Sequence, residues 1–404
     1  MHHEQLPHLF RVEYARMTAV LCRHFGLQYI EVAEDIASET FLKAAELWAL
    51  QGMPDNATGW LYTVAKNKTR DYLRRQHVFD KQVKPGLSTD LYEEPDFDFT
   101  HQTINDSQLA MIFAVCNPAN SVESQICLAL QVLCGFSVQE IAHAFLTKKE
   151  TIKKRLLRAR ANLRNDQFRI GPLDNATIES RLDTVLRTIY LLFNEGYFST
   201  AGDQAIRKEL CSEAIRLALL LTDNTLTNTT QVNALLALFC YQSSRLDARA
   251  NEVGDLILFE QQDTSLWSRE LIDKGNYYLV QACTGNQVSK YHIEAGIAYW
   301  HTTPGANKWR HILHLYNQLV VMEYSPVIAL NRTFAFAKVY GYEAGIREAE
   351  RLRLEEHSGW YALLGYLYAD IDPGLAVGYY RKAVDRSTSV SERKTLMREV
   401  ERLQ

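Results

Sequence analysis

Apolar residues recur at the spacing of an α-helix along almost the whole chain. In the stretch 33–50 one stripe holds small and apolar residues while the charged residues fall on the other side, and that stripe consists of Ile36, Ala37, Thr40, Ala44 and Leu47. From residue 178 onward the helical pattern continues, interrupted by turn-forming segments, and no strand-like alternation stands out. The sequence therefore predicts an all-α protein.

Residues 137–164 predict two short helices joined by a tight turn. Ser137 is placed to cap the first helix, with Glu140 completing a capping box. Ala142 is small where the two helices would cross closely. The second helix, at about residues 150–163, carries one apolar stripe formed by Ile152, Leu156, Ala159 and Leu163. This combination is typical of a helix-turn-helix.

The second of these helices is strongly basic. Eight Lys or Arg fall within residues 148–164 against one acid, Glu150, although the chain has 44 basic and 48 acidic residues in all and a net charge of −4. Such a helix can enter the major groove of DNA, where Lys and Arg contact phosphates and base edges. The alternative is a basic face that is merely solvated. Because the turn, the small crossing residue and the charge coincide, we expect DNA binding.

A second basic cluster lies on the predicted helix 60–76 and consists of Lys66, Lys68, Arg70, Arg74 and Arg75. Trp60, Tyr62 and Tyr72 are interleaved with it. A surface of this kind can hold the bases and phosphates of an opened DNA strand. The alternative is that these aromatic side chains belong to the core.

Composition divides the chain into four segments. Helical patterns fill residues 6–83 and 107–168, and the acidic stretch 84–106, which contains two prolines, is expected to be a linker. A shorter break at 169–177 precedes a helical region at 178–404. Near its end the spacing resembles tetratricopeptide repeats, with small and aromatic residues on two successive helices: Leu364, Gly365 and Tyr368, then Ala376, Tyr380 and Ala383. We therefore expect helix pairs that stack into an array.

No pattern for catalysis, a metal or a cofactor is present. The sequence has no phosphate loop, nucleophile elbow or metal-ligand spacing, so we expect neither an enzyme nor a bound cofactor. His311 and His314 share a helix face but lack a third ligand, which favours a packing or surface role. The seven cysteines are scattered and sit mostly among apolar residues, which indicates buried, reduced thiols.

Two further segments bear on location and on binding. No window is long and apolar enough for a membrane span, and the N-terminus lacks the pattern of a signal peptide, so a cytoplasmic protein without a membrane partner is expected. The group Asn194, Glu195, Gly196 and Tyr197 follows an apolar run. It is either a ligand or partner site or, as we favour, a helix C-terminus with Gly196 as a left-handed cap.

Three stretches resemble bacterial sigma factors of the extracytoplasmic-function type, within the sigma-70 family. AEDIASETFLKAAELWA (33–49) resembles region 2.2, GWLYTVAKNKTRDYLRRQ (59–76) resembles regions 2.3–2.4, and FSVQEIAHAFLTKKETIKKRLLRAR (136–160) resembles region 4. Their order and spacing match as well. The resemblance implies a sigma region 2 domain, a region 4 helix-turn-helix domain and a role in transcription initiation. Core RNA polymerase, through its beta and beta-prime subunits, and promoter DNA are the implied partners.

The resemblance also implies three sets of site residues. Docking on core polymerase is assigned to Glu34, Asp35, Glu39, Phe41 and Lys43, unless this helix face is only solvated. Binding of the −10 element is assigned to Asn56, Asn67, Arg70, Asp71, Arg74 and Arg75. Binding of the −35 element is assigned to Lys148, Lys149, Glu150, Thr151, Lys153, Lys154, Arg155 and Arg158. The family often has Gly where this chain has Leu146, and Glu150 and Lys154 also depart from it, so the preferred −35 bases stay open.

The C-terminal region resembles an extension found in one subgroup of these factors, through the stretches 181–198 and 329–341. The extension is tetratricopeptide-like and implies regulation within the same chain, in place of a separate anti-sigma protein, with its sign open and a requirement for full activity favoured. The array is also a candidate surface for a protein or peptide partner. The alternative function is a one-component helix-turn-helix regulator whose helical array senses a ligand or a protein, but that hypothesis leaves residues 33–76 unexplained.

Overall fold

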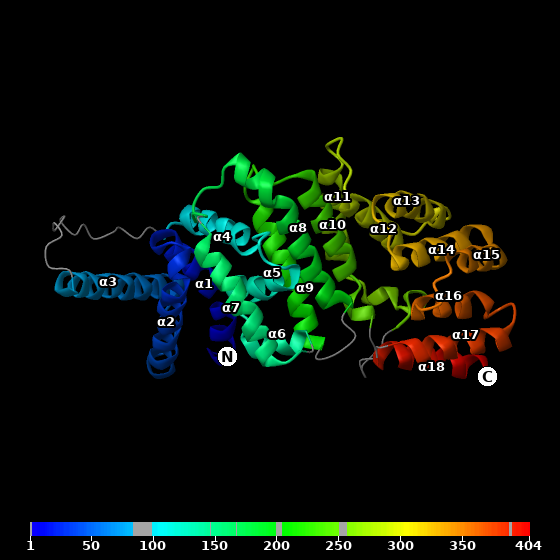
Figure 1. Ribbon diagram of the computed structural model, residues 1–404, viewed down its shortest axis with the longest axis horizontal. Coiled ribbons are helices and arrows are strands. Elements are labelled where there is room, and N and C mark those ends of the chain that lie inside the picture. The colour runs from blue at the N-terminus through cyan, green and yellow to red at the C-terminus, as the bar shows by residue number, and fades with distance from the viewer. Residues whose placement is uncertain are drawn as a thin grey trace. The chain divides into compact units, whose positions relative to one another are not determined.

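The computed structural model describes residues 2–83, 99–145, 147–166, 168–198, 204–249, 257–387 and 390–404 (Figure 1). Every long regular element in this part of the chain is a helix, which confirms the all-α prediction. The chain forms two compact units, Met1–Ile189 and Tyr190–Gln404. None of the described helices is long and apolar enough to span a membrane.

The first unit consists of helices joined mostly by short turns. They are α1 (His2–Phe25), α2 (Ile30–Gln51), α3 (Ala57–Val83), α4 (His101–Val115), α5 (Val122–Leu128), the π-helical turn η2 (Ala129–Leu133), α6 (Val138–Ala144), α7 (Lys149–Asn165) and the first part of α8 (Asn175–Phe198). Gly26 and Gly52 follow α1 and α2 with φ of 86° and 81°, a backbone conformation that glycine adopts without strain. The two glycines therefore fix where the first two helices end.

Helix α1 lies at the centre of the first unit. It packs against α2 and α3 on one part of its surface and against α4 and η2 on another. Met17 and Leu21 of α1 are fully buried, as are Met111 and Phe113 of α4. The two segments that the sequence suggested as separate domains, 6–83 and 107–168, therefore share one hydrophobic core.

The boundaries of that unit differ from the composition breaks. Helix α4 begins at His101 with Thr100 as its N-cap, inside the stretch expected to be a linker, of which residues 84–98 lie outside the described part. In α8, Arg181 donates to Asp166 at 3.0 Å and Thr188 donates to Gln125 at 2.7 Å. The start of α8 therefore belongs to the first unit, because its polar partners lie there.

The second unit is an array in which each helix packs against at least one neighbour along the chain. Its helices are α9 (Gln204–Thr222), α10 (Thr230–Ser243), α11 (Arg269–Ala282), α12 (Lys290–Thr302), α13 (Lys308–Met322), α14 (Pro326–Tyr340), α15 (Tyr342–Leu352), α16 (Ser358–Tyr368), α17 (Pro373–Arg386) and α18 (Val390–Leu403). The 3-10 turns η4 (Phe259–Gln261) and η5 (Thr264–Leu266) lie between α10 and α11. Contacts between neighbours along the chain are the pattern expected of stacked helix pairs.

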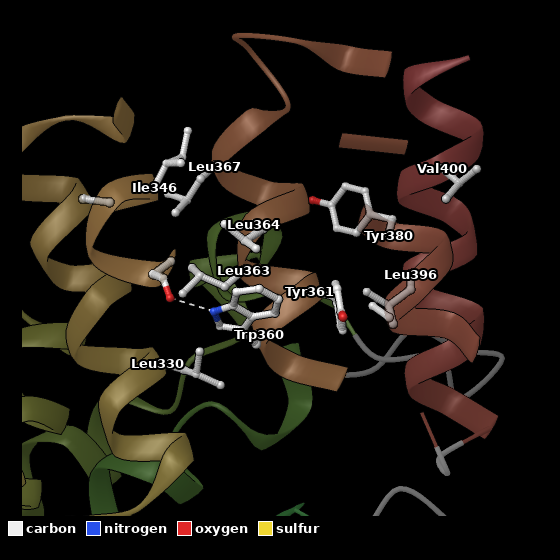
Figure 2. Close-up of a cluster of buried hydrophobic side chains, with 13 residues drawn as sticks. Leu330, Ile346, Trp360, Tyr361, Leu363, Leu364, Leu367, Tyr380, Leu396 and Val400 are labelled. Atoms are coloured by element: carbon white, nitrogen blue, oxygen red, sulfur yellow. Dashed lines mark hydrogen bonds between the residues drawn. The ribbon is translucent and has the colours of Figure 1, made fainter. Parts of the chain in front are cut away.

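One core cluster of the second unit shows how these helices are held together (Figure 2). Trp360 of α16 is buried, and its Nε1 donates to the carbonyl oxygen of Ala349 in α15 at 2.7 Å. This bond satisfies the one polar atom of a large apolar side chain. Leu364 and Leu367 of the same helix are fully buried in the cluster.

The repeat predicted at the end of the chain places a glycine at a close helix crossing. A Cβ on Gly365 of α16 would lie 2.8 Å from Cδ1 of Tyr380 in α17. Tyr380, Ala376 and Ala383 are buried in the interface. The small residue is therefore required by the distance between the two helices.

The predictions for Gly196, for the two histidines and for the cysteines can be compared directly with the structure. The Gly196 cap is wrong, because α8 continues to Phe198 and Gly196 is buried inside it without a positive φ. His311 stacks on Trp300 with ring centroids 4.1 Å apart, and His314 contacts Gln318, so each has a packing or local polar role. All seven cysteines are free thiols, and six of them are buried.

The close crossing at Gly365 leads to a stability prediction. Gly365→Ala should destabilise the second unit by about 1–2 kcal/mol, because the added methyl group must push the Tyr380 ring away. Denaturant unfolding of the full chain measures this change. The matched control is Gly378→Ala in α17, where a Cβ meets no atom within 4 Å. That change should stabilise by roughly 0.5–1 kcal/mol through helix propensity. Equal effects of the two changes would contradict the close crossing.

Candidate nucleic-acid interface

Helices α6 and α7 form the helix pair that the sequence predicted. Ser137 Oγ accepts from the Glu140 backbone N–H at 3.2 Å, and Glu140 Oε2 accepts from the Ser137 N–H at 2.7 Å, which confirms the capping box. Ile141 and Ala142 are buried. In α7 the predicted apolar stripe is buried at every position: Ile152, Leu156, Ala159 and Leu163. Leu146 in the connecting turn lies outside the described residues.

The N-terminal end of α7 presents positive charge to solvent. Lys148 is the N-cap residue and makes no side-chain capping bond. The exposed members of the predicted −35 set are Lys148, Lys149, Glu150, Lys153, Lys154 and Arg158, while Thr151 and Arg155 are half-buried. Lys153 pairs with Glu150 at 2.9 Å, which leaves an excess of positive charge at this end. An uncapped helix N-terminus with basic side chains is well suited to an anion such as a DNA phosphate.

Helix α3 carries the predicted −10 residues on its solvent side. Asn67, Asp71 and Arg74 follow one another at helical spacing and are exposed, and Asp71 pairs with Arg74 at 3.0 Å. Arg75 is exposed, and Arg70 is half-buried. Asn56 lies before the helix, where its Oδ1 accepts from the Gly59 N–H at 2.8 Å and so caps α3. The helix therefore presents polar and basic groups along one side.

The aromatic residues interleaved with this cluster are packed against other rings, as the alternative interpretation predicted. Trp60 lies 5.3 Å from Trp48 and Tyr72 lies 5.9 Å from Phe25, measured between ring centroids. Tyr62 is buried, and its hydroxyl donates to Glu13 at 2.7 Å. These contacts hold α3 in place.

The predicted docking residues on α2 fall into two groups. Asp35, Glu39 and Lys43 are exposed, and Glu39 pairs with Lys68 of α3 at 2.6 Å. Phe41 is buried, with its ring 5.0 Å from that of Phe10, so it supports the helix from inside. Glu34 forms an ion pair with Arg160 of α7. The exposed face that a partner can meet is therefore smaller than the predicted set.

Arg160 of α7 forms a bidentate ion pair with Glu34 of α2. Its Nη1 and Nη2 each donate to one carboxylate oxygen at 2.7 Å. Its Nε and Nη2 also donate to Gln131 Oε1 of the π-helical turn η2, at 3.1 Å and 2.8 Å. A second pair joins Arg164 to Glu31. Helices α2 and α7 and the turn η2 thus meet at one charged group.

The Arg160–Glu34 pair is largely shielded from solvent. The side chains of Arg160 and Glu34 are only 12% and 14% exposed. Burial by itself would lower the pKa of Arg160, but the hydrogen bonds and charge of Glu34 outweigh it and raise that pKa. Removing one member of such a pair leaves the other charge buried without compensation.

The sequence pattern did not predict this contact. Arg160 lies off the apolar stripe of α7, on the side of this basic helix that its charge pattern favours for solvent or DNA. Spacing within α7 separates buried from outward positions, but it cannot show that another part of the chain covers the outward side. The π-helical turn that presents Gln131 also has no signature in residue spacing.

The buried ion pair predicts different effects for two arginines of α7. Arg160→Ala should lower the free energy of unfolding of the first unit by about 2–3 kcal/mol, because Glu34 loses its partner. Arg158→Ala, two residues earlier and exposed, should change it by less than about 0.5 kcal/mol. Chemical denaturation of the full chain compares the two. Similar unfolding of both variants would show that the ion pair adds nothing to stability.

Comparisons with known proteins agree with the region 2 resemblance. Residues 9–78 match Sigma-70 region 2, and residues 181–283 match a family of unknown function, DUF6596. RNA polymerase sigma factor YlaC of Bacillus subtilis (strain 168) is 26% identical over 169 residues, which cover 41% of this chain and 93% of YlaC. No solved structure matches the chain.

A longer similarity extends over both units. The uncharacterised protein R00370 of Rhizobium meliloti (strain 1021) is 32% identical over 383 residues, which cover 92% of this chain and 89% of R00370. This similarity shows that the chain belongs to the same family as R00370, and the Sigma-70 region 2 domain, with the similarity to YlaC, supports its membership of the sigma-70 family.

Proposed function

We propose that the protein is a sigma factor of the extracytoplasmic-function type, which directs core RNA polymerase to promoters. The observation that carries the proposal is the combination, in one compact unit, of a Sigma-70 region 2 domain and a basic helix with an exposed, uncapped N-terminus. Region 2 alone accounts for polymerase and −10 binding in this family. The α6–α7 pair adds a second element that can read DNA, which supports assignment to region 4.

Each group of exposed residues has a role in this proposal. Asp35, Glu39 and Lys43 of α2 contact core polymerase at its beta and beta-prime subunits. Asn67 and the arginines of α3 read and hold the −10 strand, and the first turns of α7 enter the major groove at the −35 element. Tethering the two DNA contacts through polymerase makes them act as one strong contact, although each is weak alone.

The described conformation is, in this proposal, a resting form. The −10 and −35 elements are named for positions about 25 base pairs apart, which corresponds to roughly 85 Å of duplex at 3.4 Å per base pair. Arg160 of the −35 helix contacts Glu34 of the docking helix at 2.7 Å. Both elements cannot be read while these helices touch, so polymerase binding has to break the pair. The variant Arg160→Ala, which lacks it, should then bind core polymerase more tightly.

Promoter recognition by α7 can be tested in reconstituted transcription with sigma-free core polymerase. The double variant K154A/R158A removes two exposed cations of α7 and should abolish −35-dependent transcripts while leaving polymerase binding intact. A plot of the logarithm of the promoter affinity against the logarithm of the salt concentration has a negative slope. If both cations contact phosphates, this slope should become shallower by about 2 in the double variant.

The control and the alternative function use the same assay. Lys274→Ala removes an exposed cation of α11 in the second unit and should leave transcription unchanged. Full activity of K154A/R158A would refute the −35 assignment. If the unchanged protein binds DNA but starts no transcripts with core polymerase, it is a one-component regulator.

We also propose that the second unit is a tetratricopeptide-like array that regulates the first unit within the same chain. A chain that ends at residue 203 keeps all of α8, whose start packs into the first unit, and removes α9–α18. Transcription should fall in this variant, because the resemblance implies that the extension is needed for full activity. Circular dichroism and polymerase binding check that the shortened chain is folded. Transcription equal to that of the full chain would refute regulation.

A further inference from the structure

A run of aromatic rings joins the ends of several helices in the second unit. Successive ring centroids lie 6.1 Å apart from Trp267 to Phe259, 4.7 Å from Phe259 to His301, 5.7 Å from His301 to Trp309 and 5.5 Å from Trp309 to Phe334. Cations are set among these rings. We call the part around Phe259 the cationic aromatic patch, and it consists of Arg245, Phe259, Trp267, His301, Lys308 and Trp309.

Next to the patch, the chain shows how an acidic residue binds on this surface. Glu260 of η4 accepts from Lys338 at 2.7 Å and from the Tyr366 hydroxyl at 2.7 Å. Phe259, the residue before it, packs on the ring of His301. A ring followed by a carboxylate is therefore seated on rings and cations from α12, α14 and α16.

The two cations around Phe259 lack such a carboxylate. Arg245 lies 4.9 Å from the ring centroid of Phe259, and Lys308 lies 5.5 Å from it. Arg245 donates to the Tyr197 hydroxyl at 2.8 Å, and in the described part of the chain no carboxylate forms an ion pair with Arg245 or Lys308. Both side chains are half-buried and can still be reached from solvent. Among the described residues, neither of these two charges is therefore paired with a carboxylate.

The position of Lys308 adds to this positive field. Lys308 is the first residue of α13, whose N-cap, Asn307, makes no side-chain capping bond, and the first turn contains no acid. The positive end of the helix dipole and a positive side chain therefore coincide, which is unfavourable without an anion. Burial, and then the nearby Arg245, lower the pKa of Lys308 despite the opposing effect of Glu260.

Two ring nitrogens that flank Phe259 also lack partners. Trp267 Nε1 and His301 Nδ1 are buried and make no hydrogen bond to any described residue. Burial, followed by the charges of Arg245 and Lys308, lowers the pKa of His301 to about 3, so its imidazole is neutral at physiological pH. Buried polar atoms without partners are rare in native proteins and often mark the place of a missing group.

We propose that the cationic aromatic patch binds an acidic, aromatic peptide segment of another protein, with a carboxylate beside Arg245 and Lys308 and a ring beside Phe259 and Trp309. A peptide fits better than a small anion because the rings continue beyond the two cations as far as Phe334. The seated pair Phe259–Glu260 shows the same chemistry on the adjoining surface. In this site the role of Tyr197 is to hold Arg245 in place, because its hydroxyl accepts a hydrogen bond from that side chain. This inference does not depend on the assignment as a sigma factor.

Binding can be measured on the full chain with a fluorescently labelled copolymer of Glu and Tyr as the probe. Lys308→Gln should weaken binding about tenfold, because a charge-assisted hydrogen bond to a carboxylate is lost. Lys308 makes no hydrogen bond or ion pair through its side chain in the described structure, so this variant should fold normally. Arg310→Gln is the matched control, because Arg310 is exposed and lies two residues further along α13; it should bind the probe like the unchanged protein.

Three outcomes would overturn the proposal. Equal binding of the probe by the Lys308→Gln and Arg310→Gln variants would show that the probe does not bind at the cationic aromatic patch. A loss of probe binding in the α7 variant K154A/R158A, without a loss in Lys308→Gln, would place the probe on the basic helix of the first unit. Displacement of the probe by inorganic phosphate at constant ionic strength, or equal binding of poly-Glu, would show an anion site without peptide or ring recognition.

Discussion

The bidentate ion pair between Arg160 and Glu34 is the contact on which the arrangement of the first unit depends. Apolar packing of α1 against α4 brings the two helical segments together, but it is tolerant of small shifts because dispersion is not directional. The guanidinium group is directional and planar, and it fixes the orientation of α7 on α2 through two parallel hydrogen bonds. Gln131 of the π-helical turn adds a third element to the same group.

This contact gives one face of α2 two competing uses. Glu34 neutralises Arg160, while its neighbour Asp35 stays exposed with the residues proposed to meet polymerase. The exposed N-terminal turns of α7 keep their positive charge, since the ion pairs with α2 lie near its C-terminal end. An ion pair suits a contact that opens reversibly, because water solvates both ions again when the pair breaks. An apolar interface exposed in the same way would gain no such solvation.

In the second unit, cations lie over aromatic rings in addition to the buried apolar clusters. Its helices are held by buried clusters such as the one around Trp360 (Figure 2). Trp309 packs against a different cluster and is only partly buried. Cations over ring faces are stabilised there even without a carboxylate. The patch can therefore remain folded while Arg245 and Lys308 form no ion pair with a described carboxylate, which leaves both cations available to a bound one.

The sequence by itself determined the all-α class, the capping box of α6, the buried stripe of α7 and the glycine at the crossing of α16 and α17. These features depend on neighbours within a few residues or one helical turn, so periodicity reveals them. It did not determine that Phe41 faces inward, that α8 continues through Gly196, or that Arg160 meets Glu34. Those facts depend on residues far apart along the chain, and only the tertiary structure decides which outward-pointing side chain is covered and by what.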